Sequence, residues 1–413
     1  MIQVLPYRNQ QAWVQALKEV SVRTKEEIPA ATWSHRAMSE RVEGVLVEAE
    51  RKEGPMQTLM FSFDRALLDT ESASMRRIQD LAGEGMVQAV VLSHFKTDEI
   101  AQVDHVTAYG FSGSGFIRFY RAIVQGIRIV NAVPKRTLVT AQDPFIAGAA
   151  AYLVSRIKNV PLEVQEHGDF YSGYWKKESW KNRCLSLVGR FVLGQAERVR
   201  VVSDRVKEYL IAVGIKAEKI EVIPVAVELP SGIVRGGGSD VFRFVVPCRF
   251  VEQKGLDVLL KAAALLKQEN VSFHLSIIGR GPLLSSLHGM IESKGLVKEV
   301  DIQDWKEGND VWRDADGFVM SSRYEGFGRT VLEAMASKVA VVATDVGCVG
   351  SVLRPGVDGR VVSIGNAEEL AVAMKATIVD KESTDRMIAS AYERAKDFHR
   401  PRLFMKNNAL AGV

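Results

Sequence analysis

The chain has 413 residues, more than twice the usual size of one domain, so we expect two domains. Its 47% hydrophobic and 25% charged residues are typical of a folded globular protein and exclude a disordered or fibrous chain. The net charge of +4 is too small for the clustered basic surface of a nucleic-acid-binding protein, so no nucleic acid partner is predicted.

The cysteines and the N-terminal sequence predict a soluble, cytoplasmic protein. Cys184, Cys248 and Cys348 are widely spaced, which favours neither a disulfide framework nor a zinc site. The N-terminus lacks the basic and apolar stretches of a secretory signal. The longest apolar run, 145–154, is shorter than the roughly 18 residues that a membrane span needs.

The first 55 residues predict a helical extension. They are polar and charged, and Trp13, Ala16, Leu17 and Val20 form an apolar stripe at helical spacing. We interpret residues 1–55 as a helix packed on the first domain; a helix that binds a partner or a membrane surface is the alternative.

Between residues 56 and 230, predicted strands alternate with predicted helices. This alternation is typical of a parallel sheet with helices on both faces. The predicted strands are 56–63, 89–95, 137–142, 161–167, 199–203 and 219–225, and the predicted helices include 72–82 and 145–157.

A glycine-rich stretch at 235–240 predicts a linker, after which the alternation restarts. The predicted strands are 242–250, 274–279, 316–322 and 339–345, and the predicted helices are 255–267, 282–294 and 330–337. The fold class is therefore α/β, with two Rossmann-like, doubly wound parallel-sheet domains over 56–230 and 231–382. Such domains bind ligands at the carboxyl ends of their strands, and we expect them to face an interdomain cleft.

The most informative motif is Ser321–Gly347, SSRYEGFGRTVLEAMASKVAVVATDVG. A strand leads into the loop Gly326, Phe327 and Gly328, and a helix opens near Thr330. Backbone N–H groups at such a turn, together with the positive end of the helix dipole, stabilise a phosphate. Small residues let the phosphate approach the backbone closely. The loop therefore predicts a phosphate site.

Two carboxylates frame this loop. Glu325 precedes the glycines, and Glu333 lies one turn inside the helix. Thr330 and Glu333 also match a capping box, in which the glutamate bonds an N–H at the helix start. Glu325 on its own also fits a solvated acid in a loop. The local pattern leaves these alternatives open.

Two cations follow a predicted strand upstream. Arg249 ends the strand, and Lys254 stands five residues later, before a helix. An Arg fork and a Lys point charge at a strand end suit a diphosphate; two ordinary surface cations are the alternative. The glycines Gly279 and Gly281 follow the next strand, but Leu284 stands where a dinucleotide fingerprint needs its third glycine.

In this order, these motifs resemble the nucleotide-sugar half of family 4 glycosyltransferases, the retaining group with the GT-B fold. The resemblance covers about Arg249–Val362, and its core is the spacing from Glu325 to Glu333. Segments 61–77, 143–170 and 220–229 resemble parts of the first domain in a subset of these enzymes. The resemblance implies an acceptor-side domain at 56–230, a donor domain at 231–382, and a C-terminal helix at about 383–413 that crosses back to the first domain.

The resemblance also implies roles on the donor side. Arg249 and Lys254 would hold the donor diphosphate and stabilise the leaving group, and Glu325 would bind sugar hydroxyls. Glu333 would accept hydrogen bonds from the ribose. The remaining residues implied to lie near the nucleotide sugar are Gly279, Gly281, Asp304, Trp305, Lys306, Gly326, Phe327, Gly328 and Thr330.

On the acceptor side, the resemblance implies that His167 reaches the reaction centre. Asp169 would contact the acceptor hydroxyl or orient His167; a histidine after a buried strand is otherwise a common structural residue. No metal and no further cofactor are implied. The base (uridine, guanosine or adenosine), the sugar and the acceptor (a glycan, a lipid-linked sugar or a small molecule) are not resolved.

The segment Tyr171–Arg183 interleaves aromatic and basic residues, which suits a bilayer interface or a sugar-stacking surface. Contact with the inner face of the membrane is one hypothesis, and packing on the protein's own domain is the alternative. Two further function classes also stay open. One is a different GT-B enzyme, such as a nucleotide-sugar epimerase or a phosphorylase, and the other is a non-catalytic scaffold or binding subunit.

Overall fold

The computed structural model describes residues 57–82, 85–132, 137–171, 173–230, 241–306 and 308–399. The predicted N-terminal extension (1–55), the predicted linker (235–240) and the end of the predicted C-terminal helix (400–413) lie outside the described residues. The chain divides into two compact units. Among the described residues, unit 1 comprises 57–140 and 150–162, and unit 2 comprises 141–149 and 163–399.

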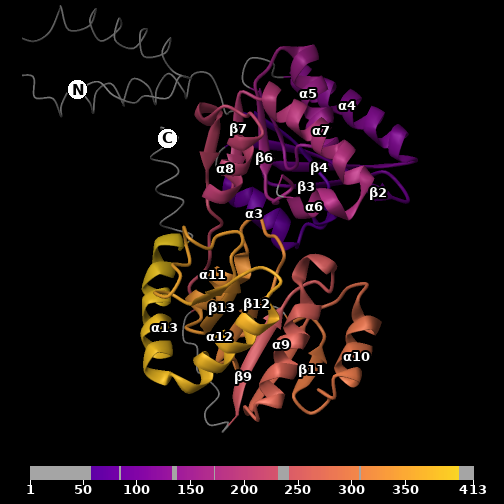
Figure 1. The fold of residues 1–413 in the computed structure, drawn as a ribbon. Coiled ribbons are helices and arrows are strands. Elements are labelled where there is room, and N and C mark those ends of the chain that lie inside the picture. Colours follow the sequence, from indigo (N-terminus) through magenta and orange to yellow (C-terminus); the bar gives the residue numbers. More distant parts are fainter. Residues whose placement is uncertain are drawn as a thin grey trace, which may run out of the picture. The chain divides into compact units, whose positions relative to one another are not determined.

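The first sheet has eight strands in the order β3-β4-β2-β1-β5-β6-β7-β8. Figure 1 labels β2, β3, β4, β6 and β7 of this sheet. Its strands are β1 (Gln57–Ser62), β2 (Met86–Phe95), β3 (Glu99–Val103), β4 (Val106–Ser112), β5 (Thr137–Ala141), β6 (Leu162–Glu166), β7 (Arg198–Val201) and β8 (Ile220–Val222). Its helices are α3 (Ala73–Ala82), α4 (Gly115–Ala132), α5 (Ile146–Lys158), α6 (Gly173–Glu178), α7 (Trp180–Gln195) and α8 (Asp204–Ala212).

One edge of this sheet departs from the expected parallel pattern. Strand β3 pairs antiparallel with β4, with Val103 opposite Val106. Only Asp104 and His105 connect the two strands, and Asp104 adopts a positive φ of 49°, as tight hairpin turns require. An antiparallel hairpin needs no crossover helix, so the alternation of strands and helices could not predict it.

The second sheet has six strands in the order β11-β10-β9-β12-β13-β14, and all of its pairs are parallel. Its strands are β9 (Phe242–Pro247), β10 (Phe273–Ile278), β11 (Val300–Gln303), β12 (Gly317–Met320), β13 (Ala340–Thr344) and β14 (Arg360–Val362). Its helices are α9 (Leu256–Gln268), α10 (Leu284–Ser293), α11 (Arg329–Ala336), α12 (Ala367–Val379) and α13 (Lys381–Ala395).

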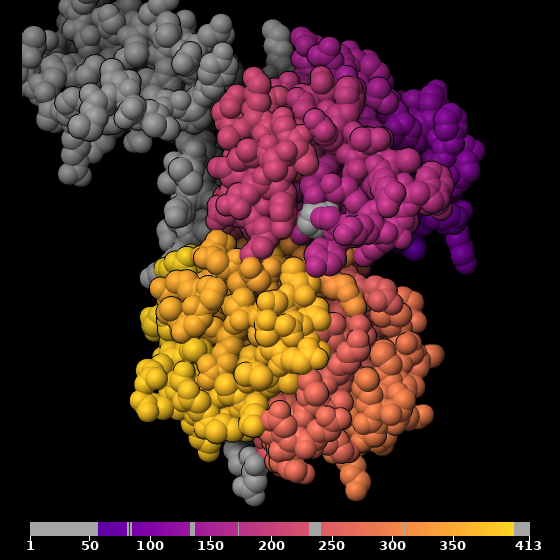
Figure 2. Space-filling model, in the orientation of Figure 1, coloured from indigo at the N-terminus to yellow at the C-terminus, as the bar shows by residue number. Residues whose placement is uncertain are grey.

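Two apolar layers hold the helices on this second sheet. On one face, α9, α10 and α12 pack on strand residues such as Phe244, Leu275 and Val342. On the other face, α11 and α13 pack on residues such as Phe318 and Val341. Figure 2 shows α12 and α13 (yellow) exposed at the surface of this part of the chain.

The predicted strands of the second sheet are longer than the observed ones at their carboxyl ends. The segment 316–322 is a strand only over Gly317–Met320. Ser321 and Ser322 leave the sheet because their hydroxyls bond the loops beside them, to the Lys254 carbonyl at 2.8 Å and to Glu325 Oε1 at 2.7 Å. These loops carry the candidate site. None of the described helices has the length and apolar character of a membrane span.

Candidate functional site

The predicted donor-side residues gather where the strand order of the second sheet reverses. Strands β9 and β12 are neighbours, and the chain proceeds from β9 toward one edge and from β12 toward the other. In open parallel sheets the loops at this position diverge and leave room for a ligand. Lys254 follows β9, and Glu325 follows β12. The topology therefore brings these two predicted residues together.

Lys254 and Glu325 form an ion pair at this position. The distance from Lys254 Nζ to Glu325 Oε1 is 2.5 Å, and Ser322 Oγ donates to the same oxygen at 2.7 Å. Their side chains are only 19% and 10% exposed, respectively. The alternative of Glu325 as a solvated loop acid is therefore wrong. Two of the three Lys254 donors, and Glu325 Oε2, make no hydrogen bond with the described residues.

The loops after β9 and β12 are joined along their backbones. Gln253 Nε2 donates to the Tyr324 carbonyl at 2.9 Å, and the Arg323 N–H donates to the Gln253 carbonyl at 2.8 Å. Gly255 begins α9 with a positive φ of 60°, and a Cβ there would overlap the Ser321 carbonyl oxygen. Only glycine fits this position, so the loop geometry depends on it.

Several hydrogen-bond donors at this strand edge donate no hydrogen bond among the described residues. Arg249 is exposed, and its guanidinium belongs to none of the salt bridges among the described residues. The N–H groups of Gly326, Phe327 and Gly328 donate none of the described hydrogen bonds. These groups precede α11, whose N-terminus adds positive potential. The arrangement suits an anion.

Glu333 does not cap α11. The helix begins at Arg329, Gly328 is its N-cap in the left-handed region, and no side chain caps it. Glu333 Oε1 instead pairs with Arg329 Nε at 2.7 Å. Burial raises the pKa of Glu333, and Arg329 opposes this shift. The capping-box alternative is therefore wrong, and Glu333 Oε2 makes no hydrogen bond with the described residues.

Close backbone packing leaves no room for a side chain at Gly279 and Gly281. A Cβ on Gly279 would overlap the Cys248 carbonyl oxygen, and a Cβ on Gly281 would press on the Phe250 backbone. The loop after β10 therefore lies directly on the loop that follows β9. Burial raises the pKa of the Cys248 thiol to about 12, so this thiol stays protonated next to the site.

The predicted base-side residues follow β11 and are exposed. Asp304 pairs with Arg280, which holds the pKa of this carboxyl at about 2. Asp304 Oδ1 also accepts from the Trp305 N–H at 2.7 Å. The Trp305 ring and Lys306 are exposed at the same strand edge. An exposed aromatic ring beside fixed polar groups can stack on a planar base.

His167 and Asp169 follow β6, and both lie in unit 2 with the donor-side residues. His167 is exposed, and its Nε2 lies 3.1 Å from Gln165 Oε1. A Cβ on Gly326 would overlap the His167 carbonyl oxygen, and Ser203 Oγ donates to the Gly326 carbonyl at 2.8 Å. The backbone of the Gly326 loop therefore lies against the His167 turn. Asp169 is buried.

A buried acid that sequence reasoning missed supports this turn. Glu166 is fully buried, and its Oε1 accepts from the Gly168 N–H at 3.0 Å. Burial raises the pKa of Glu166 well above its usual value, and the carboxylates of Asp143 and Asp169 add to the shift. Among the described residues, neither Glu166 Oε2 nor the buried Tyr171 hydroxyl has a hydrogen-bond partner. The sequence signal that could have identified Glu166 is an acidic residue at an inward-facing position of the buried strand β6.

Tyr324 was also missed, although it lies within the central motif. Its hydroxyl donates to Glu178 Oε1 at 2.7 Å. Burial and the neighbouring Glu178 raise the pKa of the phenol, so it stays protonated. Glu178 is the last residue of α6, and this bond therefore ties α6 to the loop that carries Glu325.

The aromatic segment Tyr171–Arg183 is partly internal. Tyr171 is buried, and the Trp175 ring stacks on Phe145 at 5.1 Å between centroids and lies 4.9 Å from Phe170. For Tyr171 and Trp175, packing on the protein's own domain is therefore correct. Tyr174 and Trp180 are exposed.

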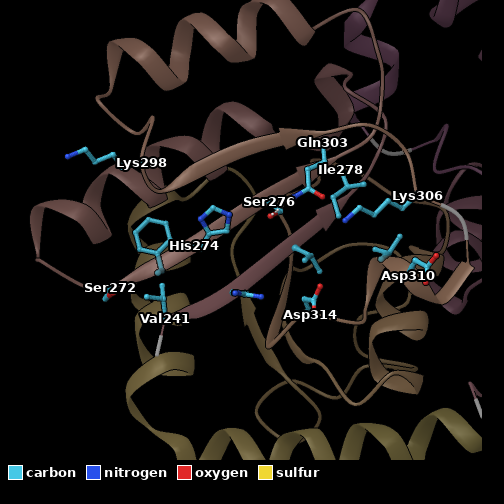
Figure 3. Close-up of a pocket in the computed structure, with 14 residues that line it drawn as sticks. Val241, Ser272, His274, Ser276, Ile278, Lys298, Gln303, Lys306, Asp310 and Asp314 are labelled. Carbon is cyan, nitrogen blue, oxygen red and sulfur yellow. Dashed lines mark hydrogen bonds between the residues drawn. The ribbon is translucent and has the colours of Figure 1, made fainter. Parts of the chain in front are cut away.

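A polar cavity of about 480 Å³ opens on the face of the second sheet (Figure 3). Its floor includes His274, Ser276 and Gln303, whose side chains all bond the Asp301 carboxylate at 2.6–2.7 Å. Helices were expected on both faces here. The crossover from β11 to β12 instead contains only the single 3-10 turn Gly308–Val311 in its described part, which is too short to cover β10 and β11.

Within the described ranges, no three His, Cys, Asp or Glu side chains lie close enough together to hold a metal ion.

Sequence comparison matches two family models. The model described as "Glycosyl transferases group 1" matches residues 238–394, and the model described as "Glycosyl transferase 4-like domain" matches residues 93–226. The chain is 28% identical over 222 residues to the putative glycosyltransferase EpsF of Bacillus subtilis, covering 50% of this chain and 57% of EpsF. It is 32% identical over 146 residues to the lipopolysaccharide core biosynthesis glycosyltransferase LpsE of Rhizobium meliloti, covering 35% of this chain and 42% of LpsE.

The chain thus spans less than two thirds of the length of these two relatives. Structural comparison finds HepE of Anabaena, solved with UDP and glucose, at a TM-score of 0.67 and 18% identity. The match covers 87% of this chain and 100% of HepE. At this identity the likeness shows the fold alone, which is the GT-B fold.

Proposed function

The chain belongs to the glycosyl transferases of group 1, and from this premise we propose that it is a retaining enzyme that uses a nucleoside-diphosphate sugar. The sugar would pass to a hydroxyl group of an acceptor. We assign the donor to the domain 231–382 and the acceptor to the domain 56–230. The observation that carries the proposal is the Lys254–Glu325 pair at the strand-order reversal, in the same part of the fold as Arg249 and the glycine-loop N–H groups that donate no hydrogen bond among the described residues.

The diphosphate would bind to Arg249, Lys254 and the backbone N–H groups that precede α11. Lys254 uses one of its three N–H donors for Glu325, so the other two can bond a phosphate without breaking the ion pair. Arg249 supplies a planar fork for two phosphate oxygens. These cations stabilise the negative charge that develops on the leaving diphosphate, and they can take the charge role that a metal has in other enzymes.

The sugar and the nucleoside would occupy the two sides of the diphosphate. Glu325 Oε2 is the acceptor for hydroxyls of the donor sugar, and Glu333 is the acceptor for hydroxyls of the ribose. Trp305 would lie near the base, with Asp304 and Lys306 beside it. The complex of HepE with UDP supports a uridine nucleotide as the first one to test.

The reaction exchanges one bond at the anomeric carbon for another. The bond from this carbon to the β-phosphate oxygen breaks, and a bond to the acceptor oxygen forms on the same face. The acceptor proton passes to the phosphate oxygen that leaves. His167, whose turn lies against Gly326, would contact the reacting sugar. Electrostatic stabilisation of the leaving group carries most of the catalysis in this scheme.

The names of two relatives support a proposal for the acceptor. LpsE is a lipopolysaccharide core biosynthesis enzyme by name, and the putative colanic acid biosynthesis glycosyltransferase WcaL of Salmonella typhimurium matches 212 residues at 28% identity. We therefore propose a glycan or a lipid-linked sugar as acceptor, in polysaccharide synthesis on the cytoplasmic side of the membrane.

Hydrolysis of nucleotide sugars without acceptor tests the proposal. The purified chain is incubated with UDP-, GDP- and ADP-sugars, and release of the nucleoside diphosphate and the anomer of the freed sugar are followed by NMR. We expect slow release from one of the three, with the donor configuration retained in the first product. An inverted first product would contradict the retaining mechanism. Nucleotide-sugar binding without any turnover, even with acceptor glycans added, would favour the scaffold class.

A further inference from the structure

Helix α7 carries an exposed apolar stripe. Trp180, Cys184, Leu187 and Phe191 recur at helical spacing along one face. Trp180 is 71% exposed, Leu187 is 70% exposed and Phe191 is 53% exposed, and Cys184 is also exposed. The opposite face of α7, with Gly189, Val192 and Leu193, is buried. The helix is therefore anchored by one face and presents an apolar stripe on the other.

Basic residues flank this stripe. Lys181, Arg183 and Arg190 are exposed, and none of them belongs to a salt bridge among the described residues. Helix α7 contains no acidic residue. The segment Gly173–Gln195 has five basic residues and one acidic residue, so its own formal net charge is +4. The surface formed by α6 and α7 is therefore locally basic.

We propose that the outer face of α7 docks on an anionic lipid surface. Apolar side chains between exposed cations are the pattern of helices that lie flat in the boundary between headgroups and acyl chains. The 11-residue rise from Trp180 to Phe191 corresponds to roughly 16 Å, so the whole stripe can lie along the bilayer plane. A second copy of the chain would bring like charges face to face, which opposes self-association through this helix.

The location of α7 connects lipid docking with the candidate site. The preceding helix α6 ends at Glu178, which accepts from the Tyr324 hydroxyl in the loop of Glu325. Within unit 2, this hydrogen bond joins the loop of Glu325 to the end of α6, and α7 begins two residues later, at Trp180. This functional consequence rests on the proposed transfer to a lipid-linked acceptor. The docking itself does not, because it can be measured without donor and acceptor.

Cys184 allows a direct test on the full chain. Among the cysteines that the structure describes, Cys184 is exposed, Cys248 is half-buried and Cys348 is buried. An environment-sensitive thiol dye on Cys184 should shift to the blue with vesicles of equal parts phosphatidylcholine and phosphatidylglycerol. Vesicles of phosphatidylcholine alone should give no shift. A Cys184→Ser variant controls for labelling elsewhere, and sedimentation of unlabelled protein with both vesicles controls for the dye.

Surface variants then assign the contact to α7. Leu187→Glu with Phe191→Glu should abolish vesicle binding, and Val372→Glu should leave it unchanged. Val372 is the matched control because it is an apolar residue, 66% exposed, on α12 of the second sheet. Arg183→Gln and Arg190→Gln should each weaken binding about fivefold, since each basic residue near an anionic surface adds roughly that factor.

Four results would overturn the proposal. They are equal binding to neutral vesicles, no dye shift with anionic vesicles, unchanged binding of the Leu187 and Phe191 double variant, and a Cys184 thiol that no dye can reach in the folded chain. The last result would mean that another part of the chain or a second copy covers the stripe; the mass of the particle in solution separates these two cases.

Discussion

Replacement of Lys254 and Glu325 by alanine should separate their stability and binding roles. The two side chains are 19% and 10% exposed. Loss of one partner from a buried pair costs about 3–5 kcal/mol, and because both groups retain some solvent contact we expect about 2–3 kcal/mol for each single variant. The double variant leaves no uncompensated charge. Its loss of unfolding free energy should therefore be smaller than the sum of the single losses by about 1–2 kcal/mol.

The two variants should differ in ligand binding. A charge-assisted bond from Lys254 to phosphate is worth about 1.5–3 kcal/mol, so Lys254→Ala should weaken nucleoside-diphosphate affinity roughly 10- to 150-fold. Glu325→Ala should leave this affinity nearly unchanged, because Glu325 is assigned to the sugar, and should instead weaken binding of the nucleotide sugar.

Calorimetry with the diphosphate and with its sugar measures both binding effects, and denaturant unfolding measures stability. Lys261→Ala, an exposed lysine of α9, is the matched control and should change neither quantity. Diphosphate affinity of Lys254→Ala within twofold of the parent chain would refute the assignment of Lys254 to the diphosphate.

Three further variants test the surrounding site. Gly326→Ala places a methyl group against the His167 carbonyl, so transfer should fall about 100-fold by displacement of the loop; unchanged kcat would contradict that contact. Glu333→Ala should abolish a roughly tenfold preference for ribose over 2′-deoxyribose nucleotides, measured by calorimetry; a preserved preference would remove Glu333 from the ribose. Glu166 has a raised pKa in the folded state, so the folded chain holds this proton more tightly than the unfolded chain, and stability falls as pH rises above about 4. Glu166→Gln cannot ionise and keeps an acceptor for Gly168, so its unfolding free energy should depend less on pH between 4 and 8; equal slopes for both proteins would exclude a buried, protonated Glu166.

Much of the second sheet was predictable because a parallel sheet imposes a strong pattern on its strands. Strands such as β9 and β13 are apolar runs bounded by loops, and α9 carries its buried leucines at helical spacing. The carboxyl ends of parallel strands share one edge, so the sequence predicts Lys254 and Glu325 at the same edge of the sheet; that their loops are adjacent follows from the observed strand order, in which β9 neighbours β12. Their roles toward a donor stay predictions until a ligand is bound.

Other features depend on contacts between distant residues and could not be read from local patterns. Thr330 and Glu333 match a capping box, but Gly328 already starts α11 and Arg329 takes the Glu333 carboxylate. The aromatic residues of Tyr171–Arg183 left an exposed surface and packing on the protein's own domain as alternatives; Trp175 stacks on Phe145, whereas the exposed stripe lies farther along α7. In both cases a tertiary contact decided between two locally equivalent arrangements.

The most direct test of the proposed function is a crystal structure of the chain with the nucleoside diphosphate that binds it best. We expect the β-phosphate within about 3 Å of Arg249 and Lys254, at the N-terminus of α11, with the ribose hydroxyls on Glu333. A diphosphate bound elsewhere on the protein, with both cations turned away from it, would contradict the account.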